Sequence, residues 1–76
     1  MSLRVILEDY KKVTEMLIEA IKSGETGEVF IGYRGKLLDE LKACDFDKSD
    51  LKKICEELGI LDIEKEAYRV LNDEKQ

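Results

Sequence analysis

The stretch GEVFIGYRGKLLDEL, residues 27–41, decides the fold class because its two halves have opposite local preferences. Val29-Phe30-Ile31 carries the β-branched and aromatic side chains of a strand, whereas the half from Lys36 to Leu41 consists largely of helix formers. A lone strand cannot satisfy its backbone, and no other part of the chain alternates convincingly between apolar and polar residues. We therefore predict one helix over about residues 27–44.

As a helix, this segment has an apolar stripe, and Thr26 is the expected N-cap, with Glu28 near the positive end of the helix dipole. The stripe consists of Phe30, Leu37, Leu41 and Cys44, with Val29, Tyr33 and Leu38 beside it. Gly32 and Gly35 each cost about 1 kcal/mol relative to alanine in a helix interior. They would be tolerated in a buried face, and they point to a close helix approach or a docking face.

A longer amphipathic helix is predicted over residues 2–22, with Ser2 as a possible N-cap and Gly24 placed to end it in the left-handed conformation. Its apolar residues recur at alternating spacings of three and four, the pattern of packed antiparallel or parallel helices. The seam consists of Leu3, Ile6, Tyr10, Val13, Leu17 and Ala20, and Val5, Ile18 and Ile21 widen it.

The C-terminal segment, residues 47–72, begins with a strong helix signal, since Asp47 is a good N-cap. It carries two apolar stripes on different sides of a helix. The first is Leu51, Ile54, Cys55, Leu58 and Leu61, and the second is Ile60, Ile63, Ala67, Val70 and Leu71. Either one helix is apolar on two sides, or the chain breaks at Gly59 and restarts with Asp62 as N-cap. Residues 72–76 are expected to fray.

These segments together predict a single all-α domain over residues 1–76, an antiparallel hairpin or bundle of three helices, with the third possibly kinked or broken at Gly59. A chain of 76 residues has a marginal core of its own and commonly recruits a partner or a second copy. Its net charge of −5 argues against nucleic acid as the main partner. The chain has no apolar run long enough for a membrane span, and its first residues lack the apolar core of a signal peptide, so we expect a cytoplasmic protein.

Catalytic machinery is not visible in this sequence, and we expect no enzyme, no cofactor and no metal. There is no histidine, and the serines and cysteines have no neighbouring base to activate them. Cys44 and Cys55 are too few for a zinc site and are expected to be small apolar core residues rather than a disulfide. The segment around Gly59 superficially resembles a helix-turn-helix, but the face it would offer to DNA carries Glu64 and Glu66.

Protein binding is the function that remains, and Arg34 is a candidate because it lies within a mostly apolar stretch. Its stem either lies along the helix face or its guanidinium anchors a carboxylate or a carbonyl of a partner. The candidate partner-binding residues are Phe30, Tyr33, Arg34, Leu37, Leu38, Leu41, Ile54, Leu58 and Leu61. These helices offer more apolar surface than a chain of this length can enclose.

The order of these features resembles the FliT-like flagellar export chaperones of bacteria over roughly residues 8–72. The resemblance lies in Arg34-x-x-Leu37-Leu38-x-x-Leu41, an aspartate-rich connector, and Leu61-Asp62-Ile63-Glu64. Gly32 and Gly35 depart from the helix formers usual around that arginine. The resemblance implies an antiparallel helical bundle that binds the amphipathic C-terminal helix of a flagellar substrate, typically the filament-cap protein. The second apolar stripe would then be either a cover over the binding face or the docking surface itself.

Two functions therefore stay open from the sequence. The first is a cytoplasmic chaperone or adaptor that binds a helix of a flagellar substrate. The alternative is a helical self-association module or small regulatory protein that buries its surplus apolar face in a homodimer.

Overall fold

The computed structural model describes residues 2–74, and these form four α-helices without any strand. They are α1 (Leu3–Lys22), α2 (Glu28–Ala43), α3 (Lys48–Leu58) and α4 (Ile60–Glu74). The predicted all-α class is confirmed, and the strand-like run at Val29 is helical. The three predicted helices become four, because the third segment is broken at Gly59, which was one of the two alternatives left open.

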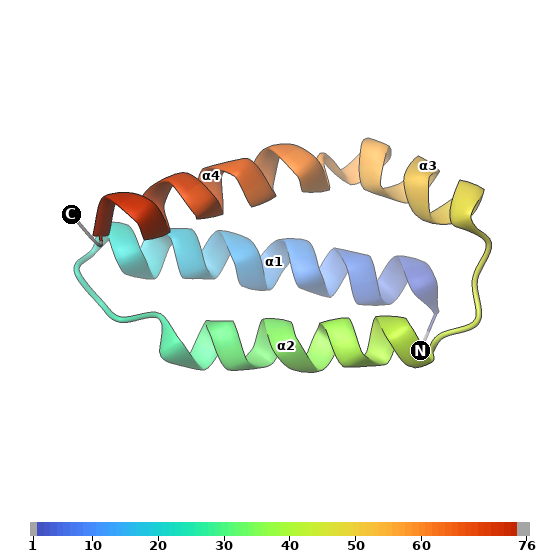
Figure 1. The fold of residues 1–76 in the computed structure, drawn as a ribbon, viewed down its shortest axis with the longest axis horizontal. Coiled ribbons are helices and arrows are strands. Elements are labelled where there is room, and N and C mark those ends of the chain that lie inside the picture. Colours follow the sequence, from blue (N-terminus) through green and yellow to red (C-terminus); the bar gives the residue numbers. More distant parts are fainter. Residues whose placement is uncertain (1, 75–76) are drawn as a thin grey trace.

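Helix α1 is the centre of the fold. Figure 1 shows α1 between α2 on one side and the pair α3 and α4 on the other, with α2 running antiparallel to the other three helices. Both α2 and α4 pack closely on α1, whereas no Cα atom of α2 lies within 8 Å of a Cα atom of α3 or α4. The helices therefore form three rods, with α1 between α2 and the rod of α3 and α4, and no backbone contact closes the side between α2 and α3–α4.

The sequence of α1 explains its ends. The Ser2 Oγ accepts a hydrogen bond from the Val5 N–H (3.3 Å), and Gly24 adopts a left-handed φ of +87° after the last turn. The N–H groups of Gly24 and Glu25 bond the carbonyls of Ile21 and Ala20, which is the Schellman pattern of a helix end. Both predicted caps are confirmed.

The buried face of α1 includes most of the predicted seam. Its buried residues are Ile6, Leu7, Tyr10, Val13, Thr14, Leu17, Ile18, Ala20 and Ile21. Leu7 and Thr14 are additions to the prediction, and Thr14 satisfies its hydroxyl by donating to the Tyr10 carbonyl (2.8 Å). Val5 was expected to widen this face but is 42% exposed, because neither flanking rod covers its side of α1.

The start of α2 differs from the prediction. Gly27, not Thr26, is the N-cap, with a left-handed φ of +70° and no side-chain capping bond. Gly27 is buried, and a Cβ built on it would lie 2.5 Å from the Leu17 Cδ1. The chain turns tightly here to bring α2 back along α1, and only glycine has both the conformation and the small size.

The break between α3 and α4 lies at Gly59, the glycine that the sequence marked as a possible helix end. The Asp47 carboxylate caps α3 by accepting from the Ser49 N–H (3.1 Å), as predicted. Gly59 ends α3 with a φ of +68°. Helix α4 begins at once with Ile60, so Asp62 lies in its first turn and is not the N-cap. Residues 72–74 are helical, in contrast to the predicted fraying, and residues 75–76 lie outside the described part.

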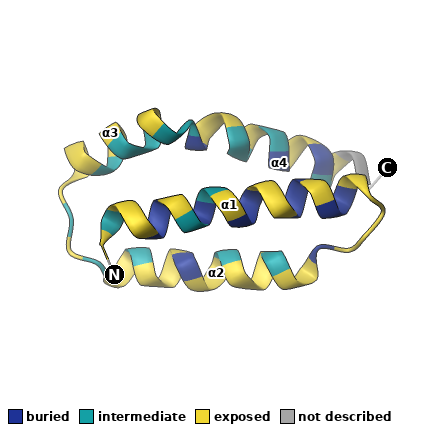
Figure 2. Ribbon diagram, turned by 180° about the vertical axis from the view of Figure 1, so that it is seen from behind, coloured by how far each residue is buried: buried dark blue, intermediate teal, exposed yellow. Residues whose placement is uncertain are grey.

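This break turns the second apolar stripe toward α1. Figure 2 shows buried residues along α1 and on the inner side of α4, whereas α2 and α3 are mostly exposed. One core cluster joins α1 to α4 through Leu17, Ile18, Ile21, Ala67 and Val70. A second joins α1, α2 and α4 through Tyr10, Val13, Leu37 and Ile60. The second stripe thus forms the core contact of α4, and α3 keeps an incompletely covered apolar face.

Candidate partner-binding surface

An apolar groove of about 250 Å³ lies on the open side of the molecule, between α2 and α3. We name it the α2–α3 groove. Its lining residues are Ile6, Leu7, Tyr10, Leu37, Leu38, Leu41, Leu51, Cys55, Ile60 and Glu64. Helix α1 supplies the floor, α2 supplies one wall, and α3 with the start of α4 supplies the other, so each wall reaches the floor without closing over it.

The two walls are shallowly buried. Helix α3 contains no buried residue, and Leu37 is the only buried residue of α2. Leu51, Ile54, Cys55 and Leu58 of α3 are all half-buried. An exposed ion pair between the Arg4 guanidinium and the Glu57 carboxylate (2.6 Å) also links α1 to α3, and it holds the pKa of Glu57 below its usual value. Helix α3 thus packs on α1 and leaves part of its own apolar surface uncovered.

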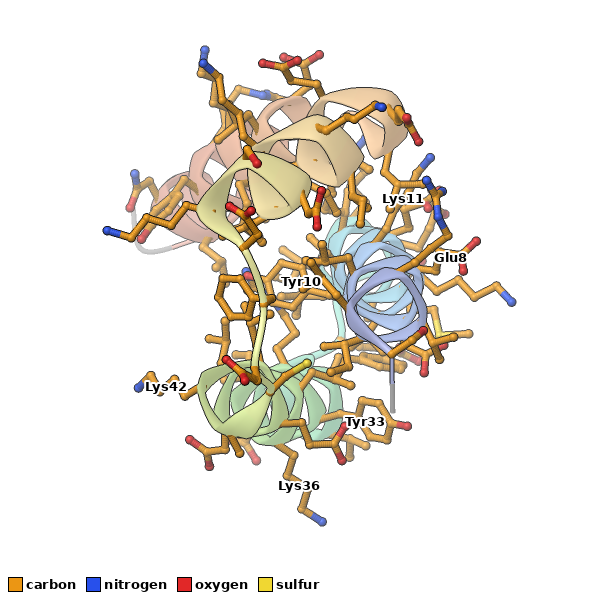
Figure 3. All side chains as sticks on the ribbon, turned by 90° about the vertical axis from the view of Figure 1, so that its right-hand side faces the viewer. Glu8, Tyr10, Lys11, Tyr33, Lys36 and Lys42 are labelled. Carbon is orange, nitrogen blue, oxygen red and sulfur yellow. The ribbon has the colours of Figure 1, made fainter. Side chains whose placement is uncertain are left out.

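A polar cluster closes the inner end of the α2–α3 groove. The Arg34 Nη2 donates to the Glu64 Oε1 (2.5 Å) and to the Tyr10 hydroxyl (2.7 Å), and that hydroxyl donates to the same Glu64 oxygen (2.8 Å). The guanidinium also lies 5.1 Å from the centroid of the Tyr10 ring, within the range of a cation–π contact. Figure 3 shows Tyr10 projecting from α1 into the space between α2 and the upper rod.

This cluster adds a polar connection between two rods whose backbones lie apart and which otherwise meet through the second core cluster. The Arg34 and Glu64 side chains are only 16% and 26% exposed, so the pair is largely shielded from solvent. Burial is the main reason that the pKa of Tyr10 is raised, with the bond to Glu64 adding to it. Arg34 therefore anchors a carboxylate, one of the two predicted roles, but the carboxylate belongs to α4 of the same chain. The Arg34 Nε is buried without a hydrogen-bond partner among the described residues.

The predicted binding residues divide among several places. Leu37, Leu38 and Leu41 line the α2–α3 groove, and Leu58 packs against the second core cluster that forms part of its floor. Leu61 was placed on the same face as Leu58, yet it is 67% exposed on α4 and lies outside the groove. The break at Gly59 reorients it.

Phe30 and Tyr33 line a different hollow, of about 350 Å³, which we name the α1–α2 groove. It consists of Asp9, Lys12, Val13, Met16, Val29, Phe30 and Tyr33. Figure 3 shows Tyr33 beside α2 and below α1, away from the space into which Tyr10 projects. The apolar residues of α2 thus extend to two flanks of the helix, and the single predicted surface is two surfaces.

Gly32 and Gly35 were expected to mark either a close helix approach or a docking face, and the first of these alternatives is wrong. Both residues are exposed, and a Cβ built on either would meet nothing within 4 Å among the described residues. They lie on the outer side of α2, away from α1.

Tyr10 and Glu64 are the polar groove residues that were missing from the predicted set, which also lacked the apolar lining residues Ile6, Leu7, Leu51, Cys55 and Ile60. Tyr10 was assigned to the core seam, and Glu64 was assigned to a solvated face. The only sequence signal was the isolated charge of Arg34 in an apolar stretch, which predicts a carboxylate partner but does not identify that partner. The partner is 30 positions away in the sequence.

Other kinds of site find little support within residues 2–74. No group of three or more potential metal ligands occurs in the described part of the chain. None of the four described helices is long and apolar enough to cross a membrane. Cys44 and Cys55 are half-buried and are not joined in a disulfide in the described structure. Burial raises the pKa of the Cys55 thiol above its ordinary value.

Comparisons with protein-family models, curated proteins and solved structures returned no match for this chain.

Proposed function

We propose that this protein is a small, non-enzymatic chaperone or adaptor that binds an amphipathic helix of a protein partner in the α2–α3 groove. The observation that supports this most directly is the open side between α2 and α3–α4. Three helical rods with partly exposed apolar walls at Leu38, Leu41, Leu51 and Cys55 have the form of a four-helix bundle that lacks one helix. A partner helix would supply that fourth rod.

The dimensions of the groove suit a helix of modest length. Helix α3 has 11 residues, which corresponds to about 16 Å at about 1.5 Å per residue. A partner helix lying along it would present apolar side chains at positions i, i+3 or i+4, and i+7 to Leu38, Leu41 and Leu51. Its remaining face would stay in solvent, where it could carry charged residues.

The sequence resemblance to FliT-like export chaperones names the first partner to test. We propose that the ligand is the amphipathic C-terminal helix of a flagellar substrate such as the filament-cap protein. Binding in the cytoplasm would cover the apolar face of this helix and keep the substrate soluble before export.

Fluorescence anisotropy with a labelled peptide of that C-terminal helix tests the proposal. We expect saturable binding that Leu41→Asp weakens about tenfold or more, because the new carboxylate would lose water when the partner docks. Leu61→Asp is the matched control, since Leu61 is an exposed leucine outside the α2–α3 groove, and it should bind as well as the parent. Circular dichroism confirms that both variants are folded.

Absence of saturable binding, or equal loss of binding in both variants, contradicts this proposal. The competing proposal is that a second copy of the chain fills the same groove, as in a self-association module. Sedimentation velocity at micromolar concentration separates the two. A stable dimer that ignores the peptide, and that Leu41→Asp dissociates, would favour the homodimer.

A further inference from the structure

The α1–α2 groove exposes large apolar side chains that the α2–α3 groove does not use. Val29 is 80% exposed, Met16 is 53% exposed and Tyr33 is 49% exposed. These side chains come from two helices and meet at one hollow, so they form a patch rather than scattered surface residues. Clustered exposed apolar surface beside a concave site is typical of an interaction surface.

The rim of this patch is acidic. A second open hollow of about 430 Å³ adjoins the α1–α2 groove and shares Met16 and Phe30 with it, so the two are continuous along α1. The charged residues that line the two hollows are Asp9, Lys12, Glu15, Glu19 and Glu25. Four carboxylates thus face one ammonium group along a single apolar channel.

These carboxylates form no ion pair within the described part of the chain. The ion pairs within residues 2–72 involve Glu57, Glu64 and Glu66 as the acids, and none of the four rim carboxylates takes part in one. A rim of unpaired acids raises the local concentration of cationic partners and repels anionic ones. The charge of the rim therefore decides what kind of partner fits.

We propose that the α1–α2 groove is a second docking site, which takes a basic amphipathic helix of a partner protein. Apolar side chains of that helix would cover Met16, Val29 and Tyr33, and its lysine or arginine residues would face the rim carboxylates. A second copy of this chain fits poorly, because a twofold interface would bring the same carboxylates together in a chain whose net charge is −5. Nucleic acid and anionic lipid surfaces are repelled by the same rim.

This site goes beyond the function proposed above, because the two grooves share no lining residue. They lie on different flanks of α2, so one molecule has room for two helices at once. The protein would then act as an adaptor between two partners rather than as a cover for one.

The test uses two synthetic peptides with the same leucine positions at i, i+3, i+4 and i+7, one with lysine and one with glutamate at the polar positions. Anisotropy is measured for each labelled peptide against the full chain at about 0.05 M and about 0.5 M salt, since screening is weak in the first and strong in the second. We expect the lysine peptide to bind, the glutamate peptide not to bind, and the affinity to fall with salt.

Three variants locate the binding. Val29→Asp should weaken the lysine peptide about tenfold or more by placing a charge against apolar side chains, and its carboxylate near the start of α2 is well tolerated by the helix. Leu61→Asp adds the same charge on an exposed leucine outside both grooves and should have no effect. Leu41→Asp should also have no effect, which keeps this result independent of the α2–α3 groove.

Replacing the rim carboxylates tests the charge argument. A triple variant with Glu15→Gln, Glu19→Gln and Glu25→Gln should bind the lysine peptide less tightly and with a shallower salt dependence. Equal binding of the two peptides, failure of the lysine peptide to bind, loss of binding in Leu41→Asp but not in Val29→Asp, or a dimer that Val29→Asp dissociates would each overturn the inference.

Discussion

Gly27→Ala is the change for which this structure predicts the clearest loss of stability. Gly27 has a φ of +70°, and an L-residue held in the left-handed region costs about 1–2 kcal/mol. The new Cβ would lie 2.5 Å from the Leu17 Cδ1. Leu17 is 0% exposed and packs in the first core cluster, so moving its side chain disturbs that cluster, and overpacking of this kind costs about 1–3 kcal/mol.

Together these effects amount to about 2–5 kcal/mol. A domain of 76 residues has a total unfolding free energy of about 4–11 kcal/mol at about 0.05–0.15 kcal/mol per residue. The variant should therefore lose a large part of its stability. The melting temperature should fall by about 10 °C or more, at about 4–8 °C per kcal/mol for a domain of this size. Thermal and urea unfolding followed by circular dichroism measure both quantities.

Gly24→Ala is the matched control for this prediction. Gly24 also has a positive φ, of +87°, but a Cβ built on it meets nothing within 4 Å. This variant should lose only the conformational part, about 1–2 kcal/mol. If Gly27→Ala proved no less stable than Gly24→Ala, the close packing of Leu17 against the start of α2 would be refuted.

Three further predictions concern stability and reactivity. Gly32→Ala and Gly35→Ala should each raise the unfolding free energy by about 0.5–1 kcal/mol, because both glycines lie in a helix interior with open space around them; a lower melting temperature would contradict this. Glu64→Ala should cost about 1–3 kcal/mol in urea unfolding, since it leaves the half-buried Arg34 without its carboxylate. Burial raises the pKa of the Cys55 thiol above its ordinary 9.0. Burial of the neutral thiol therefore contributes its full stabilisation below pH 9, and this contribution is lost as the pH rises through the pKa of the thiol in the folded state. Alkylation of Cys55 at pH 8 should accordingly be slower in the folded protein than in urea.

The helical nature of residues 27–44 was predictable because the argument needed only neighbouring residues. A strand at Val29 had nothing to pair with, and the apolar spacing from Phe30 to Leu41 fitted a helix. The caps at Ser2 and Asp47 and the helix end at Gly24 were recognisable for the same reason, since each bonds to backbone groups within a few residues.

The candidate site was only partly predictable. Leu37, Leu38 and Leu41 lie together in the α2–α3 groove because they share one side of α2. Phe30 and Tyr33 were grouped with them, yet they line the other flank of α2, where Met16 and Val13 of α1 complete the α1–α2 groove. A helical wheel shows which residues share a face, but it does not show where the neighbouring helices divide that face.

The sequence by itself determined that this chain is helical, where α1 and α3 begin, and that a glycine ends α1. These features depend on periodicity and capping, which are properties of contiguous residues. Only the tertiary structure decided that the chain breaks into α3 and α4, that Arg34 binds Glu64 of α4, and that the bundle stays open between α2 and α3. Each of these outcomes depends on how whole helices pack, because the free energy of burial is set by contacts between distant segments rather than by local preference.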